Sequence, residues 1–264
     1  MTANILIFDS GVGGFSIFQP IRQALPGLKS CYLMDNQLFP YGIQPDDVLI
    51  ERIVSLCHKA CQRFDIDMVV IACNTASTLA LEALRQRFQL PFVGAVPAIK
   101  PAAEISKSGI IGVLATPGTV DRAYTQALVD TFASHRTVVL HGCKNLAEMA
   151  EGCLRGVPLS DENLAAEIAP VFVKQGGRRT DAVVLGCTHY PLIADRIASV
   201  APWPVDLIDP SDAIARQVAR VAGKENSACD VAVETPTALL TKSSADFVRV
   251  LAQEGFARND LVAL

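Results

Sequence analysis

Apolar runs of strand length alternate along this chain with longer segments whose apolar residues recur at helical spacing. In the first part, the pattern predicts strands at 5–8, 30–34, 68–72 and 91–95, and helices at 15–25, 47–64 and 78–88. In the second part, it predicts strands at 110–115, 137–140, 181–185 and 205–208, and helices at 122–132, 145–154, 163–174, 192–200 and 212–222. The stretch 224–233 is polar and weakly patterned, so we expect mostly loop there.

This alternation predicts an α/β fold with mostly parallel sheets flanked by helices on both faces. The predicted strands are continuous apolar runs, which is typical of strands covered on both sides. Prolines and a glycine between 91 and 101, and Pro202-Trp203-Pro204 further on, indicate two crossings between lobes. We therefore expect a first lobe of residues 1–96 and 207–264 and a second lobe of residues 97–206.

Composition narrows the classes of protein that this chain can be. Its 264 residues are 50% hydrophobic, enough for two domains with buried cores. The net charge of −4 and the lack of a long basic run argue against a nucleic-acid partner. No apolar run approaches the ~18 residues of a membrane span, and the first residues lack a signal-peptide pattern. We expect a cytoplasmic protein.

Eight cysteines in such a chain are expected to be reduced, because disulfide-dense frameworks belong mostly to small secreted domains. Cys57 and Cys61 flank His58 on a predicted helix. A metal site is conceivable there, but packing as small apolar side chains is the favoured interpretation. Cys31, Cys143, Cys153 and Cys229 belong to no recognisable motif.

Two stretches nearly half the chain apart look like copies, and each carries a cysteine at the same place. Val69 to Thr75 is an apolar run that ends in Cys73-Asn74-Thr75, and Val183 to His189 ends in Cys187-Thr188-His189. Two like thiols suit a reaction that is nearly symmetric about one atom, such as racemisation. The alternative is that each cysteine is simply a small residue in a tight strand-to-helix turn.

Each of these cysteines is predicted to sit where a buried strand meets the start of a helix. Thr75 or Ser77 is expected to cap the first helix, and Thr188 or His189 the second, with Pro191 in its first turn. Amides at a helix N-terminus stabilise a thiolate and also bind carboxylates. One position therefore suits both a base and an acidic substrate.

The segment from Asp9 to Gly14 follows the first predicted strand and carries three glycines. Ser16 replaces the last glycine of a dinucleotide fingerprint, and no G-K-[ST] follows, so nucleotide binding is disfavoured. We expect turn amides that bind a carboxylate, with Asp9 accepting protons or hydrogen bonds. Capping of the next helix by Asp9 is the structural alternative.

Three other chemistries were weighed against proton transfer between two thiols. Zinc would need ligands such as Cys73, Cys187, His189 and Asp9, and no C-x-x-C pair supports it. A cysteine hydrolase with His189 as base leaves one cysteine unexplained. None of the motifs contains the lysine that pyridoxal phosphate requires. We therefore expect neither metal nor cofactor.

In order along the chain, five motifs together resemble the glutamate racemases of the cofactor-independent Asp/Glu racemase family. They are Asp9-Ser10-Gly11-Val12-Gly13-Gly14, Pro40-Tyr41-Gly42, Ala72-Cys73-Asn74-Thr75-Ala76, Ala115-Thr116-Pro117-Gly118-Thr119 and Gly186-Cys187-Thr188-His189-Tyr190-Pro191-Leu192. The resemblance covers nearly the whole chain. It implies two pseudo-symmetric lobes with the active site in the cleft between them.

The resemblance also implies the roles of individual residues. Cys73 would remove the α-proton of D-glutamate while Cys187 delivers one to the opposite face, with the roles reversed for L-glutamate. Asp9 and His189 would assist the thiols. The residues implied to hold the substrate are Ser10, Tyr41, Gly42, Asn74, Thr75, Thr116, Thr119, Glu151 and Thr188. The product, D-glutamate, would supply peptidoglycan synthesis.

Two segments, 35–42 and 96–101, look like the branch of the family that responds to a UDP-muramoyl-alanine precursor. That branch often carries an N-terminal extension, which this sequence lacks. A homodimer is expected. The rival functions are an aspartate or related racemase that uses the same cysteines, and a non-catalytic amino-acid-binding or regulatory protein.

Overall fold

The computed structural model describes residues 4–223, 235–256 and 258–261. The chain divides into two compact units. Unit 1 comprises Met1–Ala95 and Ser211–Leu264, and unit 2 comprises Val96–Pro210. The predicted loop at 224–233 and Cys229 lie outside the described residues.

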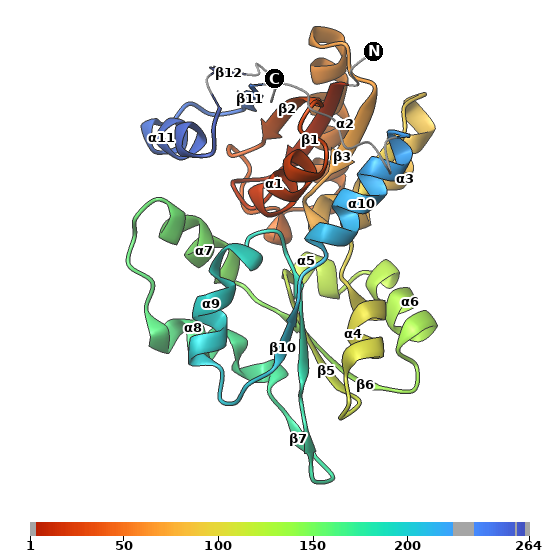
Figure 1. Ribbon diagram of the computed structural model, residues 1–264, viewed down its shortest axis with the longest axis vertical. Coiled ribbons are helices and arrows are strands. Elements are labelled where there is room, and N and C mark those ends of the chain that lie inside the picture. Colours follow the sequence, from red (N-terminus) through yellow and green to blue (C-terminus); the bar gives the residue numbers. More distant parts are fainter. Residues whose placement is uncertain (1–3, 224–234, 257, 262–264) are drawn as a thin grey trace. The chain divides into compact units, whose positions relative to one another are not determined.

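Unit 1 is built on a parallel sheet with the strand order β12-β11-β2-β1-β3-β4 (Figure 1). Its strands are β1 (Asn4–Asp9), β2 (Lys29–Met34), β3 (Met68–Ile71), β4 (Phe92–Gly94), β11 (Thr237–Leu240) and β12 (Arg258–Leu261). Its helices are α1 (Phe15–Ala24), the 3-10 helix η1 (Tyr41–Ile43), α2 (Asp46–Arg63), α3 (Asn74–Arg87), α10 (Ser211–Val221) and α11 (Ala245–Gln253).

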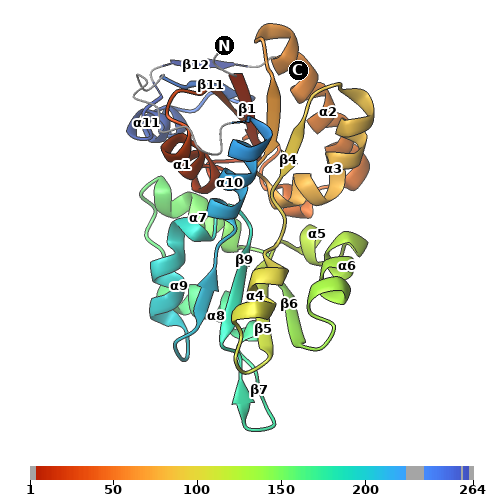
Figure 2. The same ribbon diagram turned by 45° about the vertical axis from the view of Figure 1, so that its right-hand side comes forward.

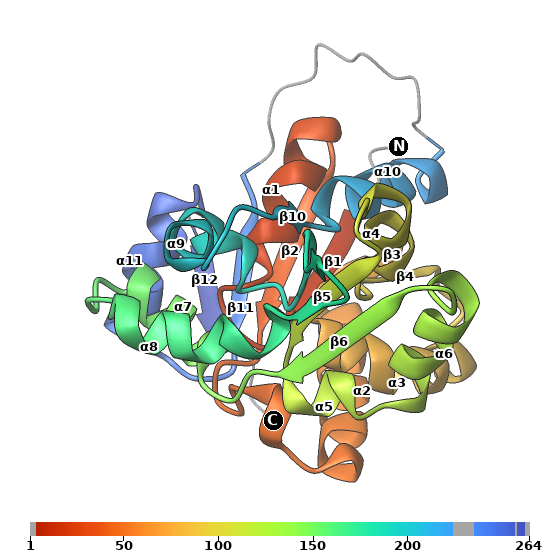
Figure 3. The same cartoon turned by 90° about the horizontal axis from the view of Figure 1, so that it is seen from below.

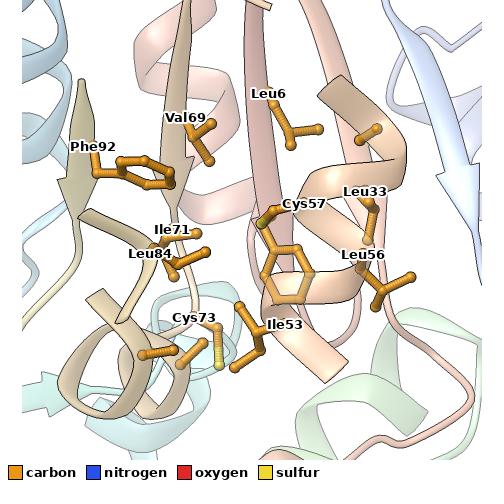
Figure 4. Packing of buried hydrophobic residues seen from close by; sticks show 14 of the residues in the cluster. Leu6, Leu33, Ile53, Leu56, Cys57, Val69, Ile71, Cys73, Leu84 and Phe92 are labelled. Atoms are coloured by element: carbon orange, nitrogen blue, oxygen red, sulfur yellow. The ribbon is translucent and has the colours of Figure 1, made fainter. Parts of the chain in front are cut away.

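Both faces of this sheet are covered, as the continuous apolar strands predicted. Alternate residues of one strand face opposite sides. On one face, Leu6 and Phe8 pack with α2 and α3 (Figure 4). On the other, Tyr32 of β2 lies with its ring centroid 5.0 Å from that of Phe15 in α1. Figure 2 shows α1 and α10 on one side of the sheet, with α2 and α3 on the other.

Unit 2 holds a four-stranded parallel sheet with the order β10-β9-β5-β6, flanked by α4 and α6 on one side and α7, α8 and α9 on the other (Figure 3). Its strands are β5 (Ile110–Ala115), β6 (Thr137–Gly142), β9 (Ala182–Gly186) and β10 (Asp206–Ile208), with a separate hairpin of β7 (Lys174–Gln175) and β8 (Arg178–Arg179). Its helices are α4 (Ile99–Ile105), α5 (Pro117–Val120), α6 (Ala123–Phe132), α7 (Leu146–Leu154), α8 (Asp161–Ile168), η2 (Ala169–Val171), η3 (Pro191–Ile193) and α9 (Ala194–Val200).

The two sheets share a core with the same strand order. In unit 1 the order is β2-β1-β3-β4, and in unit 2 it is β6-β5-β9-β10. Each of these strands thus has a counterpart at the same place in the other unit. Strand β3 corresponds to β9, so Cys73 and Cys187 follow equivalent strands. In parallel sheets, ligands bind beyond the carboxyl ends of strands, where both cysteines lie.

One predicted helix is confirmed only in its first half. The sequence predicts a helix over 163–174, but α8 ends at Ile168 and the short η2 follows. Pro170 lies in η2, where it provides no backbone N–H for continuing the α-helical ladder. The chain then forms the β7–β8 hairpin, which was not predicted. Gly176 and Gly177 have φ of 58° and 75°, as the two positions of a tight hairpin turn require.

The favoured interpretation of the helical cysteines is confirmed. Cys57 is fully buried and belongs to the core between the sheet and α2, and Cys61 packs against that core. The ring of His58 faces Phe88, 6.2 Å between centroids. Every described cysteine is a free thiol. Among the described residues, no helix combines the length and apolar character needed to cross a bilayer.

Candidate functional site

The first candidate half-site lies where β3 leads into α3. Cys73 directly precedes α3 and is its N-cap residue, with an extended backbone (φ −60°, ψ 120°). Its Sγ atom is 3.7 Å from Ser10 Oγ, which belongs to the segment after β1. Figure 4 shows Cys73 beyond Ile71 on the same segment, with Ile53 beside it. The thiol is therefore held at the helix N-terminus next to a hydroxyl.

The expected side-chain caps of α3 are wrong. The helix begins at Asn74, four residues earlier than the sequence pattern predicts, and Cys73 makes no side-chain capping bond. Thr75 therefore lies inside the first turn. Ser77 donates its hydroxyl to Ile71 O at 2.7 Å, which ties the helix back to β3. Asn74 and Thr75 are both buried at this end of the helix.

The segment after β1 forms a tight turn around Asp9. The carboxylate accepts a hydrogen bond from Gly11 N at 2.9 Å, while Tyr32 Oη donates to Gly11 O at 2.7 Å. The N-cap residue of α1 is Gly14 rather than Asp9. A Cβ on Gly14 would lie 2.5 Å from Tyr32 Oη and 2.7 Å from Asp9 Cβ, so only glycine fits.

Tyr41 and Gly42 lie in η1, which packs against α3. Tyr41 is buried, and its hydroxyl donates to Asp35 Oδ2 at 2.6 Å. Burial and the charge of Asp35 raise the pKa of Tyr41 well above its usual value, so the phenol stays protonated. Asp35 was not among the predicted site residues, although its position directly after β2 marks it as a polar residue at a strand end.

The second candidate half-site lies at the end of β9. Cys187 is followed by His189, whose Nδ1 is 3.8 Å from Cys187 Sγ. On its other side, His189 Nε2 lies 2.6 Å from Glu151 Oε2, which α7 supplies. These three side chains are all buried. The structure thus brings the carboxylate, the imidazole and the thiol into one chain of polar contacts.

The environment of His189 favours its charged form. Burial lowers the pKa of this imidazole, but hydrogen bonds to Cys187 and Glu151 and the negative charge of Glu151 raise it, and the net shift is well above its usual value. A protonated His189 donates through both ring nitrogens. It can therefore stabilise negative charge on the sulfur.

The expected caps at this end are also wrong. Neither Thr188 nor His189 is an N-cap: a 3-10 turn, η3, begins first, with Tyr190 at the N-cap and no side-chain capping bond. Pro191 occupies the first turn, as expected. Thr188 is buried beside His189.

Two threonines stand at the end of β5, the strand next to β9. Thr116 is the N-cap residue of α5, and Thr119 lies within that helix. Their Oγ1 atoms are 3.0 Å apart. Thr125 fixes the turn by donating its hydroxyl to Thr119 O at 2.6 Å. Both hydroxyls are buried at the carboxyl edge of the unit 2 sheet.

Among the described residues, a group of three side chains could act as metal ligands, and it differs from the zinc ligands considered from the sequence. His141, Cys143 and Glu167 bring their ligand atoms within 4.8 Å of one another. Burial, reinforced by the charge of Glu167, raises the pKa of Cys143 to about 12. Asn145 Nδ2 donates to Glu167 Oε1 at 2.7 Å. An ion bound here would have to displace the thiol proton.

Comparison with known proteins gives one consistent family. A family model described as Asp/Glu/Hydantoin racemase matches residues 13–218. The chain is 45% identical to the glutamate racemase of Brucella anthropi over 253 residues, 96% of this chain and 91% of that protein. It is 46% identical to the glutamate racemase of Sinorhizobium fredii, covering 96% and 94% of the two chains.

Solved structures agree. Escherichia coli glutamate racemase, in complex with L-glutamate and the activator UDP-MurNAc-Ala, superposes with a TM-score of 0.90 at 38% identity, covering 100% of this chain and 99% of that chain. The isoform RacE1 of glutamate racemase from Bacillus anthracis gives a TM-score of 0.86 at 25% identity, covering 99% and 98%.

Proposed function

Because this chain belongs to the Asp/Glu/hydantoin racemase family and its close relatives are glutamate racemases, we propose that it interconverts L- and D-glutamate. The proposed reaction uses two thiols as its acid and base. Its product, D-glutamate, would be used for peptidoglycan synthesis. The cytoplasm is the proposed compartment.

The observation that carries this proposal is the equivalence of two strand ends. Cys73 follows β3 and Cys187 follows β9, and these strands occupy the same place in sheets of the same core order. Racemisation requires proton removal from one face of an α-carbon and proton delivery to the other. Two like groups in like settings meet that requirement. The proposal assigns both half-sites to one α-carbon, with residues 1–96 and 207–264 as one lobe and 97–206 as the other.

The proton balance fixes the starting state of each sulfur. With D-glutamate, Cys73 begins as thiolate, takes the α-proton and becomes a thiol. Cys187 begins as thiol, gives its proton to the opposite face and becomes a thiolate. L-Glutamate reverses both changes. Each turnover therefore leaves the enzyme ready for the opposite direction.

Neighbouring groups support each thiol in this scheme. Ser10 Oγ, 3.7 Å from Cys73 Sγ, can donate to the thiolate, and Asp9 orders the turn that carries it. His189, held by Glu151, stabilises the thiolate that Cys187 becomes when D-glutamate reacts. In a buried setting such groups stabilise charge more strongly than water does.

Substrate binding is proposed for the polar residues around these strand ends. A glutamate ligand offers two carboxylates and an ammonium group, so it needs both donors and acceptors. Amides at the start of α3 and hydroxyls at the end of β5 suit the carboxylates. The residues assigned to binding are Ser10, Tyr41, Gly42, Asn74, Thr75, Thr116, Thr119, Glu151 and Thr188.

The main experiment follows the optical activity of D-glutamate in D₂O with purified protein, without added metal or pyridoxal phosphate. The expected result is loss of the circular dichroism signal with deuterium incorporated at Cα. Cys73→Ser and Cys187→Ser should each abolish racemisation, while Cys61→Ser, a half-buried thiol outside both half-sites, should retain it. Near-normal turnover in both active-site variants would contradict the two-thiol mechanism, and turnover of aspartate alone would reassign the substrate.

A UDP-muramoyl-alanine precursor is proposed as an activator of this chain. The E. coli protein at 38% identity is described with UDP-MurNAc-Ala as its activator, and segments 35–42 and 96–101 resemble that branch. A rate increase on adding the precursor is expected. Full activity without it and no change on its addition would remove this proposal. A homodimer is also proposed, and sedimentation velocity tests it.

A further inference from the structure

Asp35 stands at the centre of a buried network that includes a proposed substrate-binding residue. The residue follows β2 directly and has no exposed surface. Its Oδ2 accepts from Tyr41 Oη at 2.6 Å and from Arg52 Nε. Its Oδ1 accepts from Arg52 Nη2 at 2.6 Å and from Thr241 Oγ1 at 2.6 Å. Both carboxylate oxygens are therefore occupied by donors from three different segments.

Two of those donors anchor Asp35 to the rest of unit 1. Arg52 projects from α2 and forms a forked pair with the carboxylate, an arrangement that restricts the orientation of both groups. Thr241 follows β11, and its Oγ1 also accepts from Gln37 N at 3.1 Å. The hydroxyl thus links the segment after β11 to both Asp35 and Gln37.

A second bridge runs between the same two segments. Asn36 Nδ2 donates to Lys242 O at 2.7 Å, and Lys242 N donates to Asn36 Oδ1 at 3.0 Å. The two bonds are reciprocal, because the Asn36 side chain both donates to and accepts from the backbone of Lys242. The segment 35–37 is therefore held by the segment 241–242, two hundred residues further along the chain, as well as by α2.

The third donor, Tyr41, connects the Asp35 network to the surroundings of Cys73. Tyr41 and Cys73 belong to one buried cluster, and the ring of Tyr41 lies 6.2 Å from that of Phe8. Phe8 O in turn accepts from Ala72 N at 2.8 Å, directly before the thiol. The phenol donates its proton to Asp35 Oδ2 at 2.6 Å, and this bond sets the direction of the hydroxyl.

We propose that Asp35 is a positioning residue of the Cys73 half-site, which fixes Tyr41 and the turn at 40–42 against Cys73, and that Arg52 and Thr241 hold Asp35 in place. The proposal rests on the glutamate racemase function. Asp35 does not touch the substrate in this scheme. It acts through Tyr41, whose misplacement by about 1 Å would be enough to slow the reaction strongly.

The test uses Thr241→Val, which removes the hydroxyl at nearly constant volume, with Thr241→Ser as the variant that restores it. Thr237→Val is the matched control, because it makes the same change at the opposite end of β11, away from Asp35. Folding of each variant is checked by circular dichroism and urea unfolding. Tyr41→Phe removes the link from the other end.

The informative measurement separates the two half-reactions. Elimination from a D-glutamate analogue with a leaving group at Cβ needs proton removal by Cys73, and elimination from the L-analogue needs Cys187. In Thr241→Val and Tyr41→Phe, we expect kcat/KM for the D-analogue to fall about tenfold to a hundredfold. For Thr241→Val, the rate with the L-analogue should fall less than threefold, and Thr241→Ser should recover the D-side rate.

Two outcomes overturn the proposal. Folded Thr241→Val and Tyr41→Phe with unchanged D-side rates would show that the network does not position the half-site. Equal losses on both sides, with the same loss in Thr241→Ser or Thr237→Val, would indicate a general effect on stability.

A third measurement separates the failure of this proposal from failure of the proposed function. If wild-type protein acts on neither glutamate nor its analogues, the function itself is wrong. The rate of Cys73 alkylation by iodoacetamide, followed by peptide mass spectrometry, still tests the network. A change in Thr241→Val that Thr241→Ser reverses would support positioning, and identical rates in all variants would refute it.

Discussion

The buried contact between Glu151 and His189 makes a prediction about stability that depends on pH. The change is Glu151→Gln, which keeps a hydrogen-bonding side chain of the same size but removes its charge. In the native chain the pKa of His189 is raised, against the lowering effect of burial, by its contacts with Cys187 and Glu151. In the variant, burial is expected to dominate and to keep the imidazole neutral.

The sign follows from proton linkage. A raised folded-state pKa contributes stability that is fully present below the unfolded value, about 6.5 for histidine, and is lost as pH rises through the folded pKa. In the variant, a lowered folded-state pKa makes stability fall as pH drops below about 6.5. The two effects add, so the stability gap between wild type and variant widens steadily toward low pH.

The magnitude follows from the same linkage. Each pH unit changes the stability gap by about 1.4 kcal/mol over the range in which folded-state His189 is protonated in the wild type and neutral in the variant. Breaking one partner of a buried ion pair typically destabilises by about 3–5 kcal/mol, which sets the ceiling at low pH. Between pH 8 and pH 6 we therefore expect the gap to widen by about 1–3 kcal/mol.

Urea unfolding at pH 6, 7 and 8 measures this gap directly. Glu104→Gln is the control, because Glu104 is exposed and its 4.0 Å contact with Lys100 is expected to contribute little at any of these pH values. A gap for Glu151→Gln that stays constant within about 0.5 kcal/mol would refute the reasoning. It would mean that His189 has the same charge with and without the carboxylate.

Three further predictions concern unit 1. Gly14→Ala should destabilise by about 1–3 kcal/mol in urea unfolding, because its Cβ would overlap Tyr32 Oη and Asp9 Cβ; an unchanged midpoint would contradict the tight turn. Ile53→Ala should cost about 2–5 kcal/mol by the same assay, since Ile53 of α2 is fully buried in the core of unit 1, whereas a loss below about 1 kcal/mol would argue against that packing. Cys57→Ser should lower stability by about 1–3 kcal/mol, because it buries a hydroxyl among apolar groups, yet leave the racemisation rate of the folded protein near normal; loss of activity without loss of stability would show that Cys57 has a chemical role.

Much of the fold was readable from the sequence because buried parallel strands are continuous apolar runs. Strand β5 was predicted with its observed bounds, Ile110–Ala115. The pattern failed at β11 (Thr237–Leu240) and at the β7–β8 hairpin. The two-residue strands of that hairpin are exposed and polar, so no apolar run marks them. The pair Gly176-Gly177 is the sequence feature that indicates a hairpin turn there.

The sequence likewise predicted part of the candidate site and missed the rest. Cys73 and Cys187 could be selected because each interrupts an apolar run with a reactive side chain at a strand end. The capping assignments failed because sequence spacing does not fix where the first helical residue lies. The Asp35 network could not be predicted from the sequence, because nothing in the local pattern distinguishes Arg52 and Thr241 from ordinary surface residues. Only the fold brings them to the carboxylate.

The interrupted course of unit 1 has a consequence for the order in which the protein is made. Unit 2 is encoded by one continuous segment, whereas unit 1 needs both ends of the chain. On the ribosome, residues 96–210 are complete before α10, β11 and α11 have been synthesised, and domains generally fold as units. Thr241, which holds Asp35, is synthesised after the whole of unit 2. The Cys187 half-site can thus be built before Thr241 has been synthesised, while the Cys73 half-site is completed only after it.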